Sequence, residues 1–244
     1  MTTSLTSWSF SRYNTYSQCP ALAKYKFIDK LKEPSAPAME RGDMVHKAAE
    51  AFIDGKRPDI IPELEGFGEE LKGLAESSAS GHVETEQPWA FKRNWSRTTW
   101  NDWIGCFLRI KADVVRASVP FAKIHTPEAT TKIAEEPYID VIDWKTGRYR
   151  DESHAEYIMQ LELYALGALK MYPQVQVVNT MLAYTDQSFV FATPPYTRAD
   201  EPRLRGVWEA RIRPMMADRT FEPNPGNACR WCNFRASKGG PCKY

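Results

Sequence analysis

The sequence predicts an α/β domain built around a mixed β-sheet. Helix-type patterns occupy the first third of the chain, and strand-type patterns on either side of one long helical segment follow. No internal repeat or low-complexity segment divides the 244 residues, a length that can bury one sizeable core. Hydrophobic residues (43%) and charged residues (26%) occur in the proportions of an ordinary globular protein.

Apolar residues at helical spacing predict the helices. In chain order, these are 9–33 with Pro20 as an interruption, 41–53, 67–76, 153–172 and 200–217. Proline, glycine and serine mark three irregular stretches between elements, at 33–38, 55–66 and 120–136. The last of these could contain short strands.

Alternating or β-rich patterns predict the strands. These are 82–91, 103–115, 138–145, 175–184 and 188–192, with the last two joined as a hairpin through 185–187. We expect a single domain over 1–244. It consists of an N-terminal helical part (1–80), a core that carries the sheet (81–195), and a C-terminal helix with a cysteine-rich tail (196–244).

Charge and hydropathy narrow the class of protein. The formal net charge is only +1, so no global field draws the chain onto nucleic acid, and any contact requires local patches. Basic residues gather at 92–97, at 203–213 and near the C-terminus, although such runs usually form a solvated face. Because no apolar run could cross a bilayer and the first residues lack a signal-peptide pattern, we expect a cytoplasmic protein without membrane contact.

The most informative motif is IDWKTG at 142–147, which directly follows a β-type run. Strand side chains alternate between faces, so Asp143 and Lys145 should point to one side and Trp144 to the other. A carboxylate there can hold a divalent cation while an ammonium sits beside an attacked phosphate, the minimum for a metal-dependent nuclease. Taken alone, the pair also fits a surface ion pair at a strand end.

Two residues upstream could join this pair. Asp113 lies in an apolar run, where an acid without a partner is costly to bury. It either faces solvent or pairs with Lys111, or it converges with Asp143 on one cation such as Mg²⁺. His46 follows Gly42 by one helical turn, and a lone helical histidine is more often a core or surface residue. The two acids downstream favour a metal ligand instead.

Gln160 and Tyr164 are four residues apart on a helical segment and therefore share one face. Gln160 could contact the lysine or a phosphate, and Tyr164 could bond backbone or stack on a base. Ordinary helix packing would explain the same pair.

In this order the motifs resemble the RecB-like branch of the PD-(D/E)XK nucleases. The resemblance rests on G-x-x-x-H at 42–46, the aspartate after an apolar run, IDWKTG, and Q-L-x-x-Y-A at 160–165, with SFSRY at 9–13 and Cys19-Pro20 before them. It covers nearly the whole chain. It implies a restriction-endonuclease-like core, a mixed central sheet flanked by helices, and places the nuclease core at 81–195.

The resemblance also implies a mechanism. His46, Asp113, Asp143 and the backbone carbonyl of Trp144 would bind Mg²⁺ or Mn²⁺, and Lys145 would orient the attacking water and stabilise the phosphorane. In-line attack would then leave a 5′-phosphate. The interval from Asp113 to Asp143 is longer than in compact members. Glu84 and Glu86 could supply a further acid from an adjacent strand, or they could form an exposed strand face.

Five cysteines remain, and a cytoplasmic location disfavours disulfides. Cys229 and Cys232 form a C-x-x-C, which usually signals metal or redox chemistry. The resemblance implies a [4Fe–4S] cluster, bound by Cys19, Cys229, Cys232 and Cys242, that joins the two ends of the domain. Four thiolates also suit zinc, the alternative. Cys106 is expected to be a buried thiol in an apolar strand.

The sequence therefore favours a metal-dependent DNA exonuclease acting on DNA ends or single strands, in recombination, repair or DNA processing. Sub-classes that fit are stand-alone phage or bacterial recombination exonucleases and CRISPR-type end-trimming subunits, either with a possible recombination or replication protein partner. A catalytically silent DNA- or protein-binding platform is the alternative, and an iron–sulfur redox protein would need a partner site that the sequence lacks. Five tryptophans could stack on bases: Trp8, Trp89, Trp95, Trp100 and Trp103.

Overall fold

The structure is a computed structural model that describes residues 4–34, 36–125 and 136–244. Its centre is a mixed sheet in the order β1-β2-β3-β4-β5, with β6 paired to β4. Strands β3 and β4 are parallel, and the other pairs are antiparallel. The strands are β1 (Val83–Phe91), β2 (Leu108–Ala117), β3 (Tyr138–Lys145), β4 (Val177–Tyr184), β5 (Phe189–Ala192) and β6 (Tyr196–Thr197).

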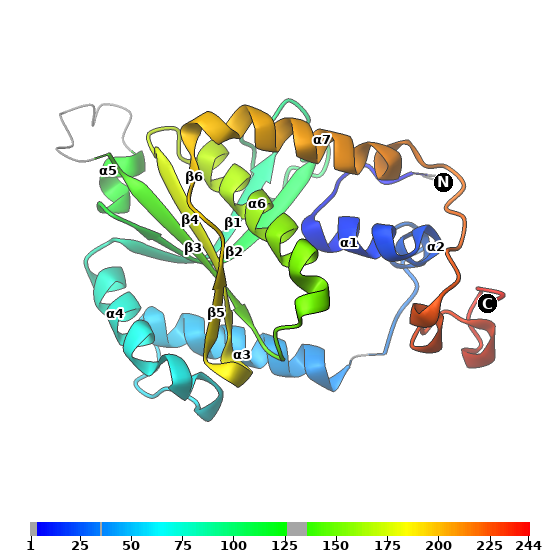
Figure 1. Cartoon of the computed structure of the whole chain (residues 1–244), viewed down its shortest axis with the longest axis horizontal. Coiled ribbons are helices and arrows are strands. Elements are labelled where there is room, and N and C mark those ends of the chain that lie inside the picture. Colours follow the sequence, from blue (N-terminus) through cyan, green and yellow to red (C-terminus); the bar gives the residue numbers. More distant parts are fainter. Residues whose placement is uncertain (1–3, 35, 126–135) are drawn as a thin grey trace.

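Helices cover both faces of this sheet, as Figure 1 shows: α1, α6 and α7 lie on one side, and α3 and α4 on the other. The helices are α1 (Phe10–Gln18), α2 (Pro20–Ala23) with a π-helical turn after it (Lys24–Ile28), α3 (Pro37–Ile53), α4 (Gly68–Ala79), α5 (Phe121–His125), α6 (His154–Met171) and α7 (Glu201–Ala217). Short 3₁₀ turns lie at Pro62–Phe67, Asp151–Ser153, Thr185–Gln187, Arg198–Asp200, Asn227–Arg230 and Ala236–Lys238. The prediction of an α/β fold with a mixed central sheet flanked by helices is confirmed, consistent with a restriction-endonuclease-like core.

The alternation of β3 separates two hydrophobic cores. Ile139 and Val141 belong to the larger core under α6 and α7, whereas Ile142 and Trp144 belong to the smaller core under α3 and α4. The sheet is thus covered on both faces, which is usual for a parallel or mixed sheet in an α/β protein. Residues at the end of β3 are therefore held between two helical layers.

The structure corrects several element predictions. The strand predicted at 103–115 begins only at Leu108, because Asp102 closes a turn by accepting a hydrogen bond from the Gly105 amide (2.7 Å). Cys106 therefore precedes the strand, although it is buried as expected. The described part of the stretch at 120–136 contains α5, and the possible short strands predicted at 126–135 lie outside the described residues. The short strand β6 has no counterpart in the prediction.

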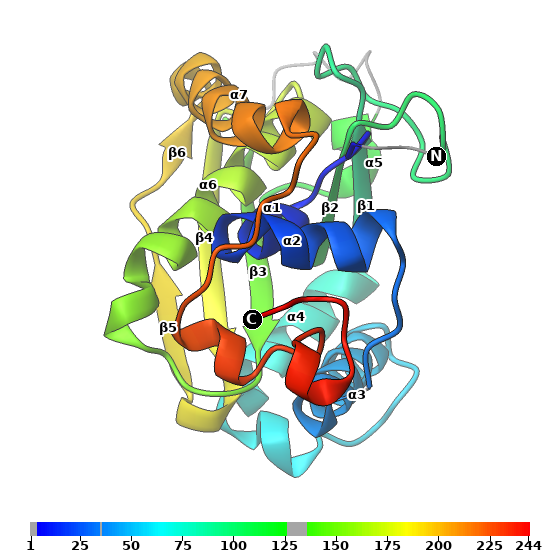
Figure 2. The same cartoon turned by 90° about the vertical axis from the view of Figure 1, so that its right-hand side faces the viewer.

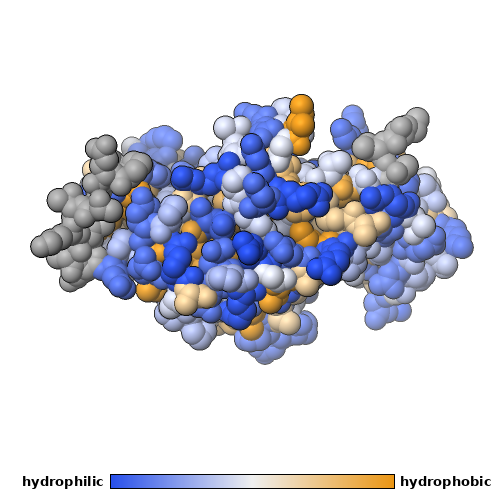
Figure 3. All heavy atoms as spheres, turned by 90° about the horizontal axis from the view of Figure 1, so that it is seen from above, coloured by the Kyte–Doolittle hydropathy of each residue, from blue (hydrophilic) through white to orange (hydrophobic). Residues whose placement is uncertain are grey.

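The helix predicted at 9–33 is divided, because Cys19 is extended and Pro20 starts a new helix at a position where its missing N–H costs nothing. The C-terminal tail lies beside α2 (Figure 2), and residues of both line one cavity. Seen from above, over α7, the surface is mainly hydrophilic (Figure 3). Among the described residues, no helix combines the length and apolar character that a membrane crossing requires.

Candidate active site

Asp113 and Asp143 lie on the neighbouring antiparallel strands β2 and β3, next to the register pair Val114 and Ile142. Both carboxylates are buried, with 8% and 4% of their residues exposed. The backbone N–H of Trp144 donates to Asp113 Oδ2 (2.8 Å), which fixes the first carboxylate against the strand that carries the second. The sheet itself therefore brings two acids, 30 positions apart in the sequence, into one volume.

Lys145 lies on the same side of β3 as Asp143, with its Nζ 2.6 Å from Asp143 Oδ2. That oxygen is buried and accepts no hydrogen bond within the described residues, since the lysine approaches it without hydrogen-bond geometry. Trp144 points the other way and packs edge-on against Phe67, with ring centroids 5.5 Å apart. A buried carboxylate oxygen without a hydrogen bond is costly unless a cation satisfies it.

Helix α6 supplies the other neighbours of Asp143. Tyr164 donates a short hydrogen bond from its hydroxyl to Asp143 Oδ1, and Gln160 Nε2 donates to the same oxygen (3.2 Å). Gln160 Nε2 also lies 3.2 Å from the Tyr164 hydroxyl oxygen. Burial, followed by the charge of Asp143, raises the pKa of Tyr164 well above its usual value, so this phenol stays protonated and acts as a donor. Gln160 and Tyr164 thus orient one carboxylate oxygen and leave the other to a cation.

Helix α3 brings His46 to the opposite side of the acids. Its Nδ1 lies 3.2 Å from Asp113 Oδ2. Burial alone would lower the pKa of His46, but the hydrogen bond to Asp113 and the charges of Asp113 and Asp143 outweigh it and raise the pKa. Gly42 lies one helical turn before His46, and a Cβ there would be 3.4 Å from Thr146 Oγ1, so this part of α3 lies near the end of β3.

Glu86 on β1 also reaches this cluster. Ligand atoms of His46, Glu86 and Asp113 all lie within 4.8 Å of one another, close enough to share one metal ion. Glu86 has a backbone φ of 52°, uncommon for a residue other than glycine, and its carboxylate forms a close ion pair with Lys111. Asp143 is outside this group because its carboxylate faces Lys145 and Tyr164 instead.

From the sequence, Glu84 and Glu86 are equal candidates for an additional acid, ranked after His46, Asp113, Asp143 and Lys145. The structure separates them, because Glu84 pairs with His125 (3.1 Å) away from the metal group. The sequence feature that could have singled out Glu86 is its position on the strand that pairs with β2, opposite Asp113. Strand pairing could have favoured it, but the φ that redirects its backbone is not readable from the sequence.

The electrostatics of the cluster favour a bound cation. Burial, followed by repulsion from Asp143, raises the pKa of Asp113 despite its hydrogen bonds to His46 and the Trp144 amide. Two close, buried carboxylates are an unfavourable pair in the metal-free protein, and a divalent ion offsets both charges. The donor set, carboxylate oxygens with one imidazole, suits Mg²⁺ or Mn²⁺.

A cavity of about 560 Å³ opens beside this cluster. Lys145, Gln160 and Tyr164 line it beside the two acids. Helix α1 and strand β2 supply three further cations, Arg12, Arg109 and Lys111, and α6 supplies the acid Glu156. Sequence reasoning did not identify Arg12 or Arg109, although Arg12 lies within the SFSRY motif. Cations thus outnumber acids along the cavity wall, which suits a phosphate-bearing ligand.

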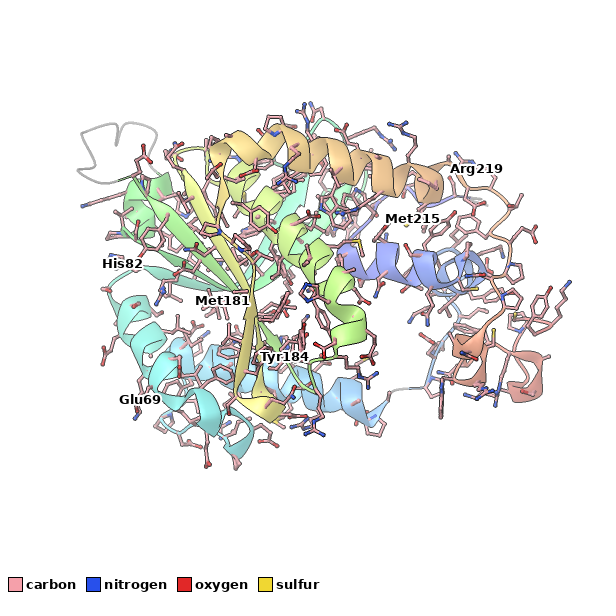
Figure 4. The ribbon with its side chains drawn as sticks, in the orientation of Figure 1. Glu69, His82, Met181, Tyr184, Met215 and Arg219 are labelled. Atoms are coloured by element: carbon pink, nitrogen blue, oxygen red, sulfur yellow. The ribbon has the colours of Figure 1, made fainter. Side chains whose placement is uncertain are left out.

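Tyr184 lies at the end of β4, beside α6 (Figure 4). Its ring packs against Tyr149 and Tyr157, with both centroid distances 5.7 Å. This aromatic contact fixes the start of α6, the helix that carries Gln160 and Tyr164, against the end of the sheet.

A second cavity, of about 180 Å³, lies between α2 and the C-terminal tail. Cys19, Cys229, Cys232 and Cys242 all line it, and Cys106 lies elsewhere. Backbone amides approach three of these sulfurs: Asn224 to Cys19 (3.4 Å), Gly226 to Cys229 (3.5 Å) and Phe234 to Cys232 (3.4 Å). Within the described residues, no three of the sulfur atoms come within 4.8 Å of one another.

Comparison with known proteins identifies the family. The model of the PD-(D/E)XK nuclease superfamily matches residues 7–237. The chain belongs to the PD-(D/E)XK nuclease superfamily. Membership implies a metal-dependent nuclease that acts on DNA.

Solved structures with a similar fold include SSO0001 and a protein described as "Putative exonuclease" from Eubacterium rectale. SSO0001 is 16% identical, covers 100% of this chain and 90% of its own, and has a TM-score of 0.47. The Eubacterium rectale protein is 12% identical, covers 93% of this chain and 87% of its own, and has a TM-score of 0.47. A search for similar curated proteins found no match.

Proposed function

We propose that this PD-(D/E)XK nuclease is an exonuclease that hydrolyses phosphodiester bonds at DNA ends or in single strands with Mg²⁺ or Mn²⁺. The observation that carries the proposal is the convergence of Asp113, Asp143 and Lys145, with one buried Asp143 oxygen left without a hydrogen bond. The cavity beside them, about 560 Å³, has the size of a pocket for a small ligand and could hold one or two nucleotides. A duplex would not enter it, which favours an unpaired strand or an end.

Each residue has a defined role in this proposal. His46, Asp113, Asp143 and the Trp144 carbonyl would hold the metal, and Glu86, whose carboxylate lies near His46 and Asp113, would be a further ligand. When bound, the ion would lower the pKa of a water molecule and neutralise the scissile phosphate. Lys145 would orient that water and hold charge on the phosphate oxygens. Gln160 and Tyr164 position Asp143.

The variant Lys145→Ala tests the proposal. We expect it to lose metal-dependent shortening of end-labelled DNA by about a hundredfold or more, because a positioned charge at the reacting phosphate is lost. Wild-type protein, purified anaerobically, should degrade labelled single- and double-stranded DNA with Mg²⁺ or Mn²⁺, and the label position gives polarity. Lys72→Ala is a matched control, because Lys72 pairs with Glu69 on the surface of α4.

If neither the wild type nor Lys145→Ala cleaves DNA while both bind it, the protein is a binding platform and the exonuclease proposal is wrong. Cleavage of closed circles as fast as of linear DNA would point to an endonuclease. Both results can be read from the same gel.

We further propose that Cys19, Cys229, Cys232 and Cys242 hold a [4Fe–4S] cluster, with zinc as the alternative. Two observations support a metal here: the four residues line one cavity, and backbone N–H groups approach three of the sulfurs. Amides that donate to sulfur stabilise thiolates, the form that binds iron or zinc. Such a site would link α2 to the C-terminal tail.

Metal analysis of anaerobically purified protein distinguishes these cases. We expect about four irons and about four sulfides per chain for the cluster, or about one zinc and no sulfide for the alternative. Cys229→Ser should lower the metal content and the thermal stability, whereas Cys106→Ala should leave the metal content unchanged because Cys106 lies outside the cavity. Equal metal in both variants would contradict the assignment.

A further inference from the structure

The connection between β1 and β2 presents two large hydrophobic side chains to solvent. Trp103 is 80% exposed and Ile104 is fully exposed. Their turn is braced: the Asp102 carboxylate accepts hydrogen bonds from Thr98 Oγ1 (2.6 Å) and from the Gly105 amide (2.7 Å). The indole is therefore held out on an ordered turn.

Arg109 joins this turn to the catalytic cavity. Its guanidinium lies 5.3 Å from the Trp103 ring centroid and 5.8 Å from that of Trp100, and its Nε donates to the Trp100 carbonyl (3.2 Å). Trp100 and Arg109 line the same cavity as Lys145. Arg109 thus contacts the exposed Trp103 ring outside the cavity and lines the cavity together with Lys145.

The other tryptophans that the sequence offered for base stacking do not compete for this role. Trp8, Trp89 and Trp95 are buried in the larger core. Trp231 is as exposed as Trp103 (83%) but lines the cysteine cavity. Among the five candidates, only Trp100 and Trp103 combine access with proximity to the site.

We propose that Trp103, backed by Arg109, is a stacking platform for a base of the unpaired DNA strand that enters the catalytic cavity. Binding sites for single strands combine a cationic groove with aromatic rings, and each stacked base adds affinity with little sequence preference. The cavity wall supplies the cations, Arg12, Arg109, Lys111 and Lys145, against the single acid Glu156. That excess of positive charge favours a polyanionic strand over a hydrophobic protein partner. The inference rests on the proposed function, since it deepens the substrate class of the same site.

Binding without metal tests the platform separately from cleavage. The probes are a labelled oligo(dT) and an abasic oligonucleotide of equal length, which keeps the phosphates but lacks the bases. With EDTA present, we expect Trp103→Ala to weaken oligo(dT) binding by about 5- to 150-fold, the range for one stacked base. Affinity for the abasic strand should stay unchanged, and Trp103→Phe should restore most of the loss.

Tyr138→Ala is the matched control, because it removes an exposed aromatic ring (41%) that lines neither the catalytic cavity nor the cysteine cavity, and it should leave binding of both probes unchanged. Equal affinity of wild type and Trp103→Ala for oligo(dT), or equal weakening with the abasic strand, would overturn the platform. If the wild type never cleaves DNA but Trp103→Ala still weakens oligo(dT) binding, the exonuclease proposal is wrong and the stacking platform stands. If Trp103→Ala still cleaves DNA and binds oligo(dT) as tightly as the wild type does, the platform is wrong and the exonuclease proposal stands.

Discussion

Replacing Asp113 by Asn is expected to make the metal-free protein more stable while abolishing its nuclease activity. Asp113 and Asp143 are buried and repel each other, and no cation other than Lys145 and a protonated His46 is paired with them in the described residues. With its oxygen at the position of Oδ2, an Asn side chain keeps the acceptor for the Trp144 amide and for an Nδ1–H of neutral His46, but it carries no charge. Near-surface estimates of such a repulsion give about 1–3 kcal/mol, so this is the expected gain in the free energy of unfolding.

The sign of the pH dependence follows from the raised pKa values of both groups. A carboxyl whose folded pKa is raised contributes stability below its unfolded pKa, about 4, and that stability is lost as the pH rises through the folded value. His46, also raised, adds stability below about 6.5 that is lost as the pH rises through its own folded value. Both of these pH-dependent contributions to stability depend on the Asp113 carboxylate. The advantage of Asp113→Asn should therefore be largest at alkaline pH and shrink as the pH falls.

Thermal unfolding with EDTA and with Mg²⁺, at several pH values, measures this. A ligand that binds only the folded protein raises its stability, so Mg²⁺ should raise the Tm of the wild type more than that of Asp113→Asn. Cleavage should fall by about three orders of magnitude, equivalent to about 4 kcal/mol of barrier. Asp59→Asn, in an exposed ion pair with Arg57, is the control. If Asp113→Asn unfolds at a lower temperature than the wild type in EDTA at alkaline pH, the carboxylate pair is not strained.

The parts of this site that follow from the local periodicity of a strand or helix can be predicted from the sequence. The shared side of Asp143 and Lys145 follows from strand alternation alone, and the structure has the same arrangement. The same period places Trp144 in the opposite core. The i,i+4 spacing of Gln160 and Tyr164 likewise puts both side chains on one face of α6.

The remaining contributions are non-local. Nothing in the neighbourhood of Glu86 shows that its backbone takes a φ of 52°, or that its strand pairs opposite Asp113. The sequence predicts only that Arg109 lies in a strand. Its contact with Trp100 and Trp103 depends on how the preceding turn folds back. The late start of β2 has the same origin, because the Asp102 turn competes with the strand for residues 103–107. Tertiary contacts decide these positions, and a single sequence does not encode them in readable form.

The site needs the whole domain because the strands supply the acids and the helices supply the groups that orient them. The two acids come from the sheet, but the groups that orient them come from α3 on one side and α6 on the other. Each helix is fixed by a separate hydrophobic core. A loosening of either core would therefore misplace one partner of the metal site, even if the acids stayed in register.

The largest stability effect is expected away from the site, for Arg116→Met. Asp140, only 3% exposed, accepts two hydrogen bonds from Arg116 across the β2–β3 ladder and one from Asn179 Nδ2 (2.7 Å). The Arg116 side chain is partly exposed and could be solvated alone, whereas Asp140 could not. Removing the arginine leaves a buried charge with one amide donor, at a cost of about 3–5 kcal/mol.

A double-mutant cycle separates this cost from the value of the ion pair. Asp140→Asn should destabilise less than Arg116→Met, because the remaining guanidinium reaches water, and the double variant should recover part of the arginine loss. Chemical denaturation of the four proteins measures all the differences. Equal losses in the two single variants would mean that Asp140 is not desolvated. Since β2 and β3 carry Asp113 and Asp143, cleavage should weaken only in variants whose sheet has loosened, so activity at low temperature should survive in Asp140→Asn.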